Sequence, residues 1–82
     1  MLDLVIQGNV DITPAINDAI HAEANVLTKF SDSSVLYIGV HVKKEHKNQY
    51  SVTLTSGGKI VTADDADLYK AIGDSFEKWK LS

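Results

Sequence analysis

Two hydrophobic periods follow one another along this chain, and their order restricts its fold more than any other feature. Leu2, Leu4 and Ile6 occupy alternate positions, which predicts a short strand with one buried face. Thr13 and Pro14 then form a strong helix start, because threonine caps and proline suits the first helical position. Beyond them the apolar residues recur at helical spacing and form one stripe: Ile16, Ile20, Ala24, Leu27 and Phe30.

The middle of the chain predicts three more strands. Residues 35–42 place Leu36, Ile38, Val40 and Val42 on one face and Tyr37, His41 and Lys43 on the other. Residues 44–48 indicate a turn or a ragged strand end. A third strand is expected over 50–55 and a fourth over 60–63, joined by a tight hairpin at Ser56-Gly57-Gly58-Lys59.

A second amphipathic helix ends the pattern. Asp64 or Asp65 is the expected cap, and the apolar stripe consists of Leu68, Ile72, Phe76 and Trp79. The resulting order is β-α-β-β-β-α, an α+β fold in which the first β-α-β step predicts a parallel pair of strands. A four-stranded sheet with both helices packed on one face buries both stripes and leaves the other face open to water or a partner.

Length and composition exclude several classes of protein. The 82 residues indicate one domain spanning 1–82, and the absence of cysteine excludes disulfides and cysteine-based zinc sites. No apolar run approaches the roughly 20 residues of a membrane span. The N-terminus lacks the basic start of a secretory signal. We therefore expect a cytoplasmic protein with no membrane partner.

The cations are all lysines, and they concentrate in the middle of the chain. All eight basic residues are lysine, and the net charge is −3. Residues 1–28 carry four acids and no lysine (−4), residues 29–59 five lysines and two acids (+3), and residues 60–82 five acids and three lysines (−2). Without arginine, a nucleic-acid contact would depend on lysine point charges and on shape.

No residue pattern indicates an enzyme, a metal site or a bound cofactor. The spacings of His21, His41 and His46 match no standard pair of metal ligands. The acidic cluster near residue 65 is explained more simply by helix capping. Gly57-Gly58 lacks the Lys-Ser/Thr and following helix of a phosphate-binding loop. A small-molecule substrate is not expected either.

Three motifs in this order resemble the bacterial ribosome hibernation promoting factor and ribosome-associated inhibitor family, also known as sigma-factor modulation proteins. The first is Ile6-Gln7-Gly8-Asn9 followed by Asp11-Ile12-Thr13-Pro14-Ala15-Ile16. The second is Leu54 with Gly57-Gly58, and the third is Asp67-Leu68-Tyr69-Lys70-Ala71-Ile72 followed by Lys78. The resemblance spans essentially the whole chain.

The resemblance implies a fold and a function. Members of this family have the β-α-β-β-β-α fold and resemble double-stranded RNA-binding domains. They lie in the decoding groove of the small ribosomal subunit, where messenger and transfer RNA would bind, and they stop translation in stressed cells. They are not enzymes and bind no cofactor. The expected partner is therefore ribosomal RNA of the small subunit.

Eight residues are candidates for RNA contact. Lys43, Lys44 and Lys47 form the primary group, at the end of a predicted strand; an alternative is that these lysines protect an exposed strand edge. The second group consists of Lys29, Tyr69, Lys70, Lys78 and Lys80. These lysines could equally be surface charges that favour solubility. Tyr69 could stack on a base or cover the edge of the core.

The first helix departs from the family pattern, and this supports an alternative function. Asn17, Glu23 and Val26 stand where the family usually has basic residues, Ala19 replaces a tyrosine, and Gly73 replaces an acid in the last helix. A diverged member that has lost RNA binding would act as a protein-interaction or dimerisation module. It would pair as a homodimer through the open sheet face or through Trp79. A piece of a longer, two-domain member is a third possibility.

Overall fold

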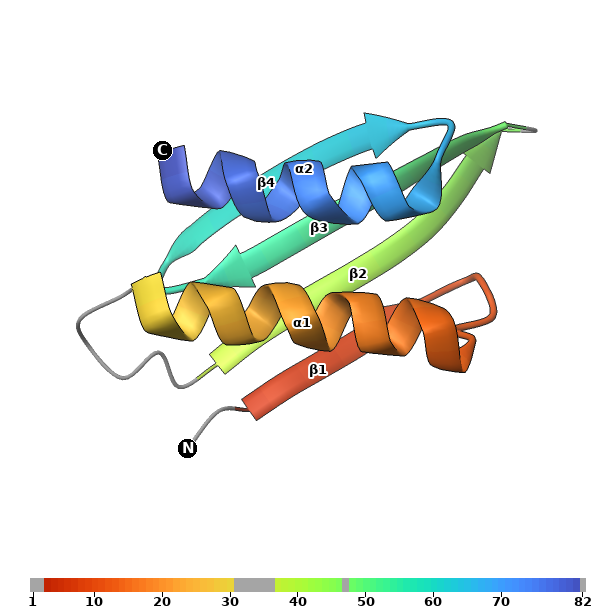
Figure 1. The fold of residues 1–82 in the computed structure, drawn as a ribbon. Coiled ribbons are helices and arrows are strands. Elements are labelled where there is room, and N and C mark those ends of the chain that lie inside the picture. Colours follow the sequence, from red (N-terminus) through yellow and green to blue (C-terminus); the bar gives the residue numbers. More distant parts are fainter. Residues whose placement is uncertain (1–2, 31–36, 47, 82) are drawn as a thin grey trace.

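Two helices lie side by side on one face of a four-stranded sheet, and both run in the same direction (Figure 1). The computed structural model describes residues 3–30, 37–46 and 48–81, with the backbone alone for Phe30 and His46. The elements follow in the order β1 (Asp3–Gly8), α1 (Pro14–Phe30), β2 (Tyr37–His46), β3 (Gln49–Ser56), β4 (Lys59–Asp65) and α2 (Leu68–Leu81). This is the predicted β-α-β-β-β-α fold.

The strands stand in the sheet in their sequence order, β1-β2-β3-β4. β1 pairs with β2 in parallel, with Ile6 opposite Val40, whereas both later pairs are antiparallel. The parallel pair confirms the prediction made from the first β-α-β step. β1 and β4 are consequently the two edges of a mixed sheet.

The turn between β3 and β4 is the predicted glycine hairpin. Gly57 and Gly58 have φ angles of 59° and 81°, so both adopt the left-handed region that a two-residue hairpin of this type requires. Residues other than glycine rarely adopt this backbone conformation, because their Cβ atom crowds the backbone. The paired glycines therefore fix the register in which Ser56 lies opposite Lys59.

The two helices begin at side-chain caps, one predicted and one not. The Thr13 hydroxyl accepts a hydrogen bond of 3.2 Å from the amide of Ile16, as expected of a cap. The cap of α2 is Asp67, whose carboxylate accepts the Tyr69 amide at 3.0 Å. The expectation of Asp64 or Asp65 was wrong, because β4 continues through both residues. Asp65 instead accepts the Asp67 amide and orders the approach to the helix.

β2 extends through His46, further than its apolar pattern indicated, so the first part of the region predicted as a turn or a ragged strand end is an irregular strand end. Lys43 pairs with Ser51 and Lys44 with Tyr50, and the register shifts only between Lys44 and His46. The Asn9 side chain accepts the Lys44 amide at 3.0 Å. This bond replaces a ladder partner beyond the end of β1, so the strand continues past its last buried residue, Val42. Leu2 and residues 31–36, for which the sequence also made predictions, lie outside the described residues.

The core lies between the helices and the sheet. Each element contributes residues that its apolar pattern predicted to be buried. They include Ile20 and Leu27 of α1, Val40 and Leu54 of the sheet, and Phe76 of α2. These five side chains are at most 2% exposed. Full burial of a side chain of this size contributes about 1.5–3 kcal/mol to folding. The shared core thus joins both helices to the same sheet face.

Trp79 joins the end of α2 to the β3–β4 hairpin. Its ring is 8% exposed, and its indole N–H donates a 3.0 Å hydrogen bond to the carbonyl of Ser56. The ammonium of Lys59 lies 4.0 Å from the ring centroid and donates to the Trp79 carbonyl at 3.0 Å. The prediction that Trp79 packs in the core is confirmed. The expectation that a homodimer could form through Trp79 is wrong, because this residue is already packed against the hairpin of its own chain.

In the described part of the chain, neither helix combines the length and the apolar content that a membrane crossing requires.

Gly8 and Gly73 should respond in opposite directions to the same substitution. A Cβ atom on Gly8 would lie 1.9 Å from the Val42 carbonyl oxygen, which is backbone and cannot move aside. We expect Gly8→Ala to lower the free energy of unfolding by about 2–4 kcal/mol. Gly73→Ala meets nothing within 4 Å in α2 and should raise this free energy by about 0.5–1 kcal/mol. Urea denaturation measures both, and equal effects would contradict the close approach at Gly8.

The cap of α2 can be tested by comparing neighbouring aspartates. Asp67→Ala removes the acceptor of the Tyr69 amide and should cost about 1 kcal/mol in thermal or urea unfolding. Asp64→Ala is the matched control, since Asp64 is exposed and lies in β4 opposite Ser51. A larger loss for Asp64→Ala than for Asp67→Ala would show that the helix is capped as first predicted.

Candidate nucleic-acid interface

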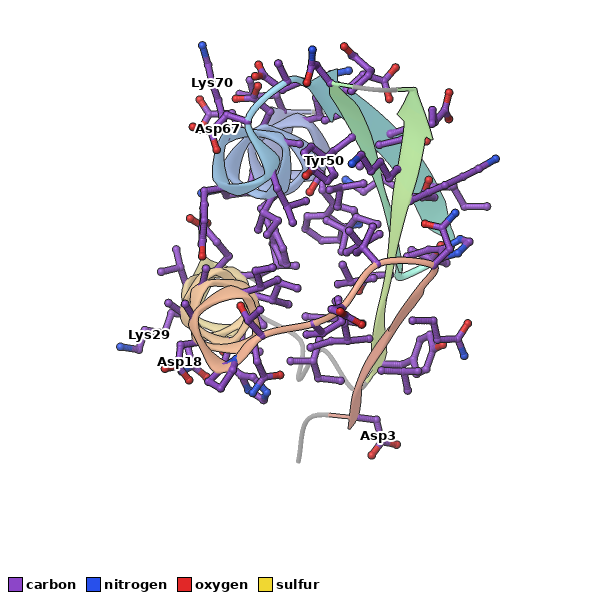
Figure 2. All side chains as sticks on the ribbon, turned by 90° about the vertical axis from the view of Figure 1, so that its right-hand side faces the viewer. Asp3, Asp18, Lys29, Tyr50, Asp67 and Lys70 are labelled. Carbon is purple, nitrogen blue, oxygen red and sulfur yellow. The ribbon has the colours of Figure 1, made fainter. Side chains whose placement is uncertain are left out.

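The sheet face opposite the helices carries no covering element among the described residues (Figures 1 and 2). Strand alternation directs the side chains of Val5, Tyr37, His41 and Thr53 to this face. The exposed Tyr37 and Ile60 also belong to it, with exposed fractions of 49% and 69%. We call this surface the open face. Its exposure agrees with the predicted one-sided packing of the helices.

A hollow of about 170 Å³ interrupts the open face at its centre. It is lined mainly by outward-facing residues of β1, β2 and β3, with Gly39 in the middle of a row between Val5 and Thr55. The other lining residues are Gln7, Tyr37, Val40, His41 and Thr53. Sequence reasoning did not find this feature. The signal for it was a glycine at an outward-facing position of a strand otherwise rich in large side chains.

Lys43 and Lys44 lie at the far end of β2 and point to opposite faces of the sheet. Lys43 shares the open face with His41, whereas Lys44 lies on the helix side, with its ammonium 5.9 Å from the centroid of the Tyr50 ring. The structure therefore places these two lysines at one end of the molecule without joining them in one patch. Lys47, the third of the primary group, lies outside the described residues.

Carboxylates accompany this pair across the sheet. In the row of Lys43, Ser51 separates the lysine from Asp64, and in the row of Lys44, Tyr50 separates it from Asp65. Two strand spacings amount to about 10 Å, which is close to the Debye length at physiological salt. The acids thus reduce the positive potential at this end, so no strong basic field surrounds the two lysines.

Tyr69 and Lys70 lie in the first turn of α2, at the same end of the molecule as Lys43 and Lys44 (Figure 1). Figure 2 shows Lys70 projecting away from the sheet. Tyr69 is 50% exposed, so much of this residue is available to a partner. These two residues are therefore brought near the predicted primary group, on the helical side.

A second set of lysines gathers at the C-terminal ends of both helices. Lys29 lies in the last turn of α1 and, in Figure 2, points away from the sheet. Lys78 and Lys80 lie in the last turn of α2. The ammonium of Lys78 donates a 2.7 Å hydrogen bond to the Thr62 carbonyl on the edge strand β4. Because the helix dipoles place partial negative charge here, lysines are favourable at this end even without RNA.

Lys59 belongs to the same end and was not among the predicted residues. Its contacts with Trp79 give it a structural role in holding α2 to the hairpin. The chain's principal-axis extents are 39, 26 and 16 Å. The candidate lysines among the described residues consequently occupy two ends of an elongated molecule, and the open face lies between them.

The described residues contain no group of three or more histidine or acidic side chains placed to hold a metal ion. Every buried side-chain nitrogen or oxygen in the described residues has a hydrogen-bond partner. The described interior thus holds no orphaned polar group that would indicate a buried ligand. The candidate site is a surface.

Two solved structures share this fold. The N-terminal domain of Thermus thermophilus Protein Y superimposes with a TM-score of 0.75 at 24% sequence identity, covering 98% of this chain and 91% of that one. A ribosomal subunit interface protein from Coxiella burnetii gives a TM-score of 0.72 at 19% identity, covering 95% and 89%. Both confirm the predicted arrangement of strands and helices. Among curated proteins, no sequence matches this chain.

A family model matches nearly the whole fold at the level of sequence. It is described as sigma 54 modulation protein / S30EA ribosomal protein, and it spans residues 4–80, from β1 to the last turn of α2. All three motifs that carried the resemblance lie within this span. The chain therefore belongs to the family of sigma 54 modulation proteins and S30EA ribosomal proteins, a ribosome-associated family and the one that its motifs predicted.

Proposed function

We propose that this protein is a translation inhibitor, or hibernation factor, that occupies the decoding groove of the small ribosomal subunit and excludes messenger and transfer RNA. The observation that carries the proposal is the family match over residues 4–80, which covers all six elements of the fold. Residues 1–82 act as one domain, in the cytoplasm of stressed cells. The mechanism is occupancy alone, so it requires no catalysis, cofactor or small-molecule substrate.

The distribution of lysines suits a cleft with two walls. Of the candidate lysines that the structure describes, Lys43, Lys44 and Lys70 lie at the end where the helices begin. Lys29, Lys78 and Lys80 lie at the end where the helices end. A single flat RNA surface would favour one patch. A groove favours cations at both ends of an elongated body, because phosphates approach from both sides. In this proposal Tyr69 lies beside the first group and contacts the same RNA wall.

The net charge of −3 makes the contacts local rather than dependent on a general positive field. Attraction at long range is weak, so shape and a few lysine–phosphate contacts must supply the affinity. Each phosphate contact releases counterions and contributes about 0.7–0.9 to the slope of log K against log salt. Binding should therefore depend on salt with a slope that reports how many lysines are engaged.

Neutralising one lysine group should reduce both the affinity and its salt dependence. In the triple variant Lys43→Gln, Lys44→Gln and Lys47→Gln, the negative slope of log K against log salt should become shallower by about 2–3. This is one unit or slightly less per lost contact. Co-sedimentation with purified small subunits between 50 and 200 mM salt, about the range over which such contacts are screened, measures it. In the second group, the double variant Lys29→Gln and Lys80→Gln should make this slope shallower by about 1.4–1.8.

The matched control changes the net charge without removing a lysine. Ala22→Glu and Asn25→Glu lie at exposed positions of α1 and add two negative charges. These changes should leave the slope within experimental error, although they lower the overall affinity slightly. An unchanged slope in both lysine variants, or no co-sedimentation at low salt, would refute the proposed contact.

A homodimer formed through the open face is a second candidate function, favoured by the exposure of Tyr37 and Ile60. If this face pairs two copies, light scattering at micromolar concentration should give twice the monomer mass of 8.9 kDa. Ile60→Asp should then restore the monomer, whereas Val26→Asp on the helical layer should not. A monomeric mass for the unaltered protein would exclude this candidate at that concentration.

A further inference from the structure

We propose that the hollow on the open face is a binding site for one unpaired RNA base, which stacks on Tyr37 above Gly39. This inference rests on the proposed function, since it concerns how the same RNA partner is held. It goes beyond that function because it assigns a base contact to the sheet, whereas the lysines contact phosphates. Sheets that present aromatic side chains are suited to stacking bases of single-stranded RNA.

The shape of the hollow follows from one missing side chain. Gly39 stands between Val5 and Thr55 in a row across three strands, so the surface drops at its position. A Cβ atom on Gly39 would lie 3.0 Å from the Tyr37 hydroxyl oxygen and 3.3 Å from a ring carbon. The Tyr37 side chain therefore lies along β2 against Gly39, in the space that a larger residue would fill, and it lines the hollow together with Val5 and Thr55.

The lining has the chemistry of a base-binding site. Tyr37 and Val5 supply apolar surface, while Gln7, His41 and Thr53 form a polar rim. A glutamine amide offers both a donor and an acceptor, and a histidine ring and a threonine hydroxyl add further hydrogen-bonding groups, which is what the edge of a base requires. The Thr53 and Thr62 hydroxyl oxygens lie 3.2 Å apart in a hydrogen bond, so this part of the rim is held in place.

Charge on the open face favours a neutral ring over a phosphate within the hollow. Among the described residues at outward-facing strand positions, Lys43 is the one lysine, whereas Asp3 and Asp64 are acidic. A phosphate centred in the hollow would have no cation beside it. A nucleobase is uncharged and planar, so it loses little by leaving water and gains the stacking surface of the tyrosine.

Lys43 is positioned to contact the phosphate attached to such a base. It follows His41 on the same face of β2, about 7 Å further along the strand. The hollow and this lysine together therefore match one nucleotide, with the base against the Tyr37 ring and the phosphate toward the end of the strand. Lys44 points to the other face and takes no part in this contact.

An oligoribonucleotide without bases isolates the predicted contact. We expect octauridylate or octaadenylate to bind about tenfold or more tightly than an abasic ribose–phosphate strand of equal length, by fluorescence anisotropy. Tyr37→Ala should abolish this difference, and Gly39→Ala should reduce it because its methyl group would displace the Tyr37 ring on which the base stacks. Tyr37→Phe keeps the ring and should retain the preference. Val26→Ala, an exposed position on α1, is the matched control and should change nothing.

Amide chemical shifts give a second readout that does not depend on the lysines. Free adenosine or uridine should shift the amides of Gln7, Gly39 and Thr53 in the unaltered protein and not in Tyr37→Ala. Equal binding of the abasic strand, a preference that survives Tyr37→Ala, or shifts confined to the helices would overturn the proposal. If light scattering gives twice the monomer mass and the nucleoside causes no amide shifts, the face binds a second copy instead.

The two proposals can fail separately. If the protein co-sediments with small subunits but does not distinguish bases from abasic strands, the base site is refuted and the inhibitor remains. If it distinguishes them but never co-sediments with small subunits, the proposed decoding-groove function is refuted, and the base site stands as a property of the sheet.

Discussion

The fold depends on one constraint: two amphipathic helices must bury their apolar stripes against the same sheet face. The core residues of both helices meet those of the central strands, and Phe76 and Ile20 are almost wholly inaccessible to water. Since both helices pack on this face, no element among the described residues covers the opposite one. That face is therefore exposed by the topology itself. Its side chains are available for a purpose other than folding.

The alternation of apolar residues was sufficient to predict the fold, because burial decides it. Ile38, Val40 and Val42 had to lie together on one face, and the glycine pair could only be a tight hairpin. Strand ends were less predictable. β2 continues through Lys43 and Lys44 because Asn9, 35 residues away in the chain, accepts the amide of Lys44. No local pattern contains that contact. The cap of α2 was misplaced for the same reason, since β3 draws Asp64 and Asp65 into the sheet.

The candidate site shows a similar division between local and long-range information. The sequence identified the lysines, but adjacent lysines on a strand point in opposite directions, so Lys43 and Lys44 cannot form one patch. The hollow at Gly39 was missed because it depends on three strands coming into register. An outward-facing glycine does not indicate a hollow until its neighbours across the sheet are known. The residue types suited to a phosphate contact can be inferred from sequence, whereas surfaces built by several strands require the register.

The bond between Lys78 and the Thr62 carbonyl has a consequence for the protein when it is not bound to a partner. β4 is an edge strand, and an uncovered edge invites another chain to add itself to the sheet. The Lys78 ammonium donates a 2.7 Å hydrogen bond to the Thr62 carbonyl, so this carbonyl cannot pair with an added strand. If the same lysine turned toward a phosphate, the carbonyl would be released only while RNA surrounded the molecule. One side chain would then protect stored copies from self-association and become available for binding only where no second copy can approach.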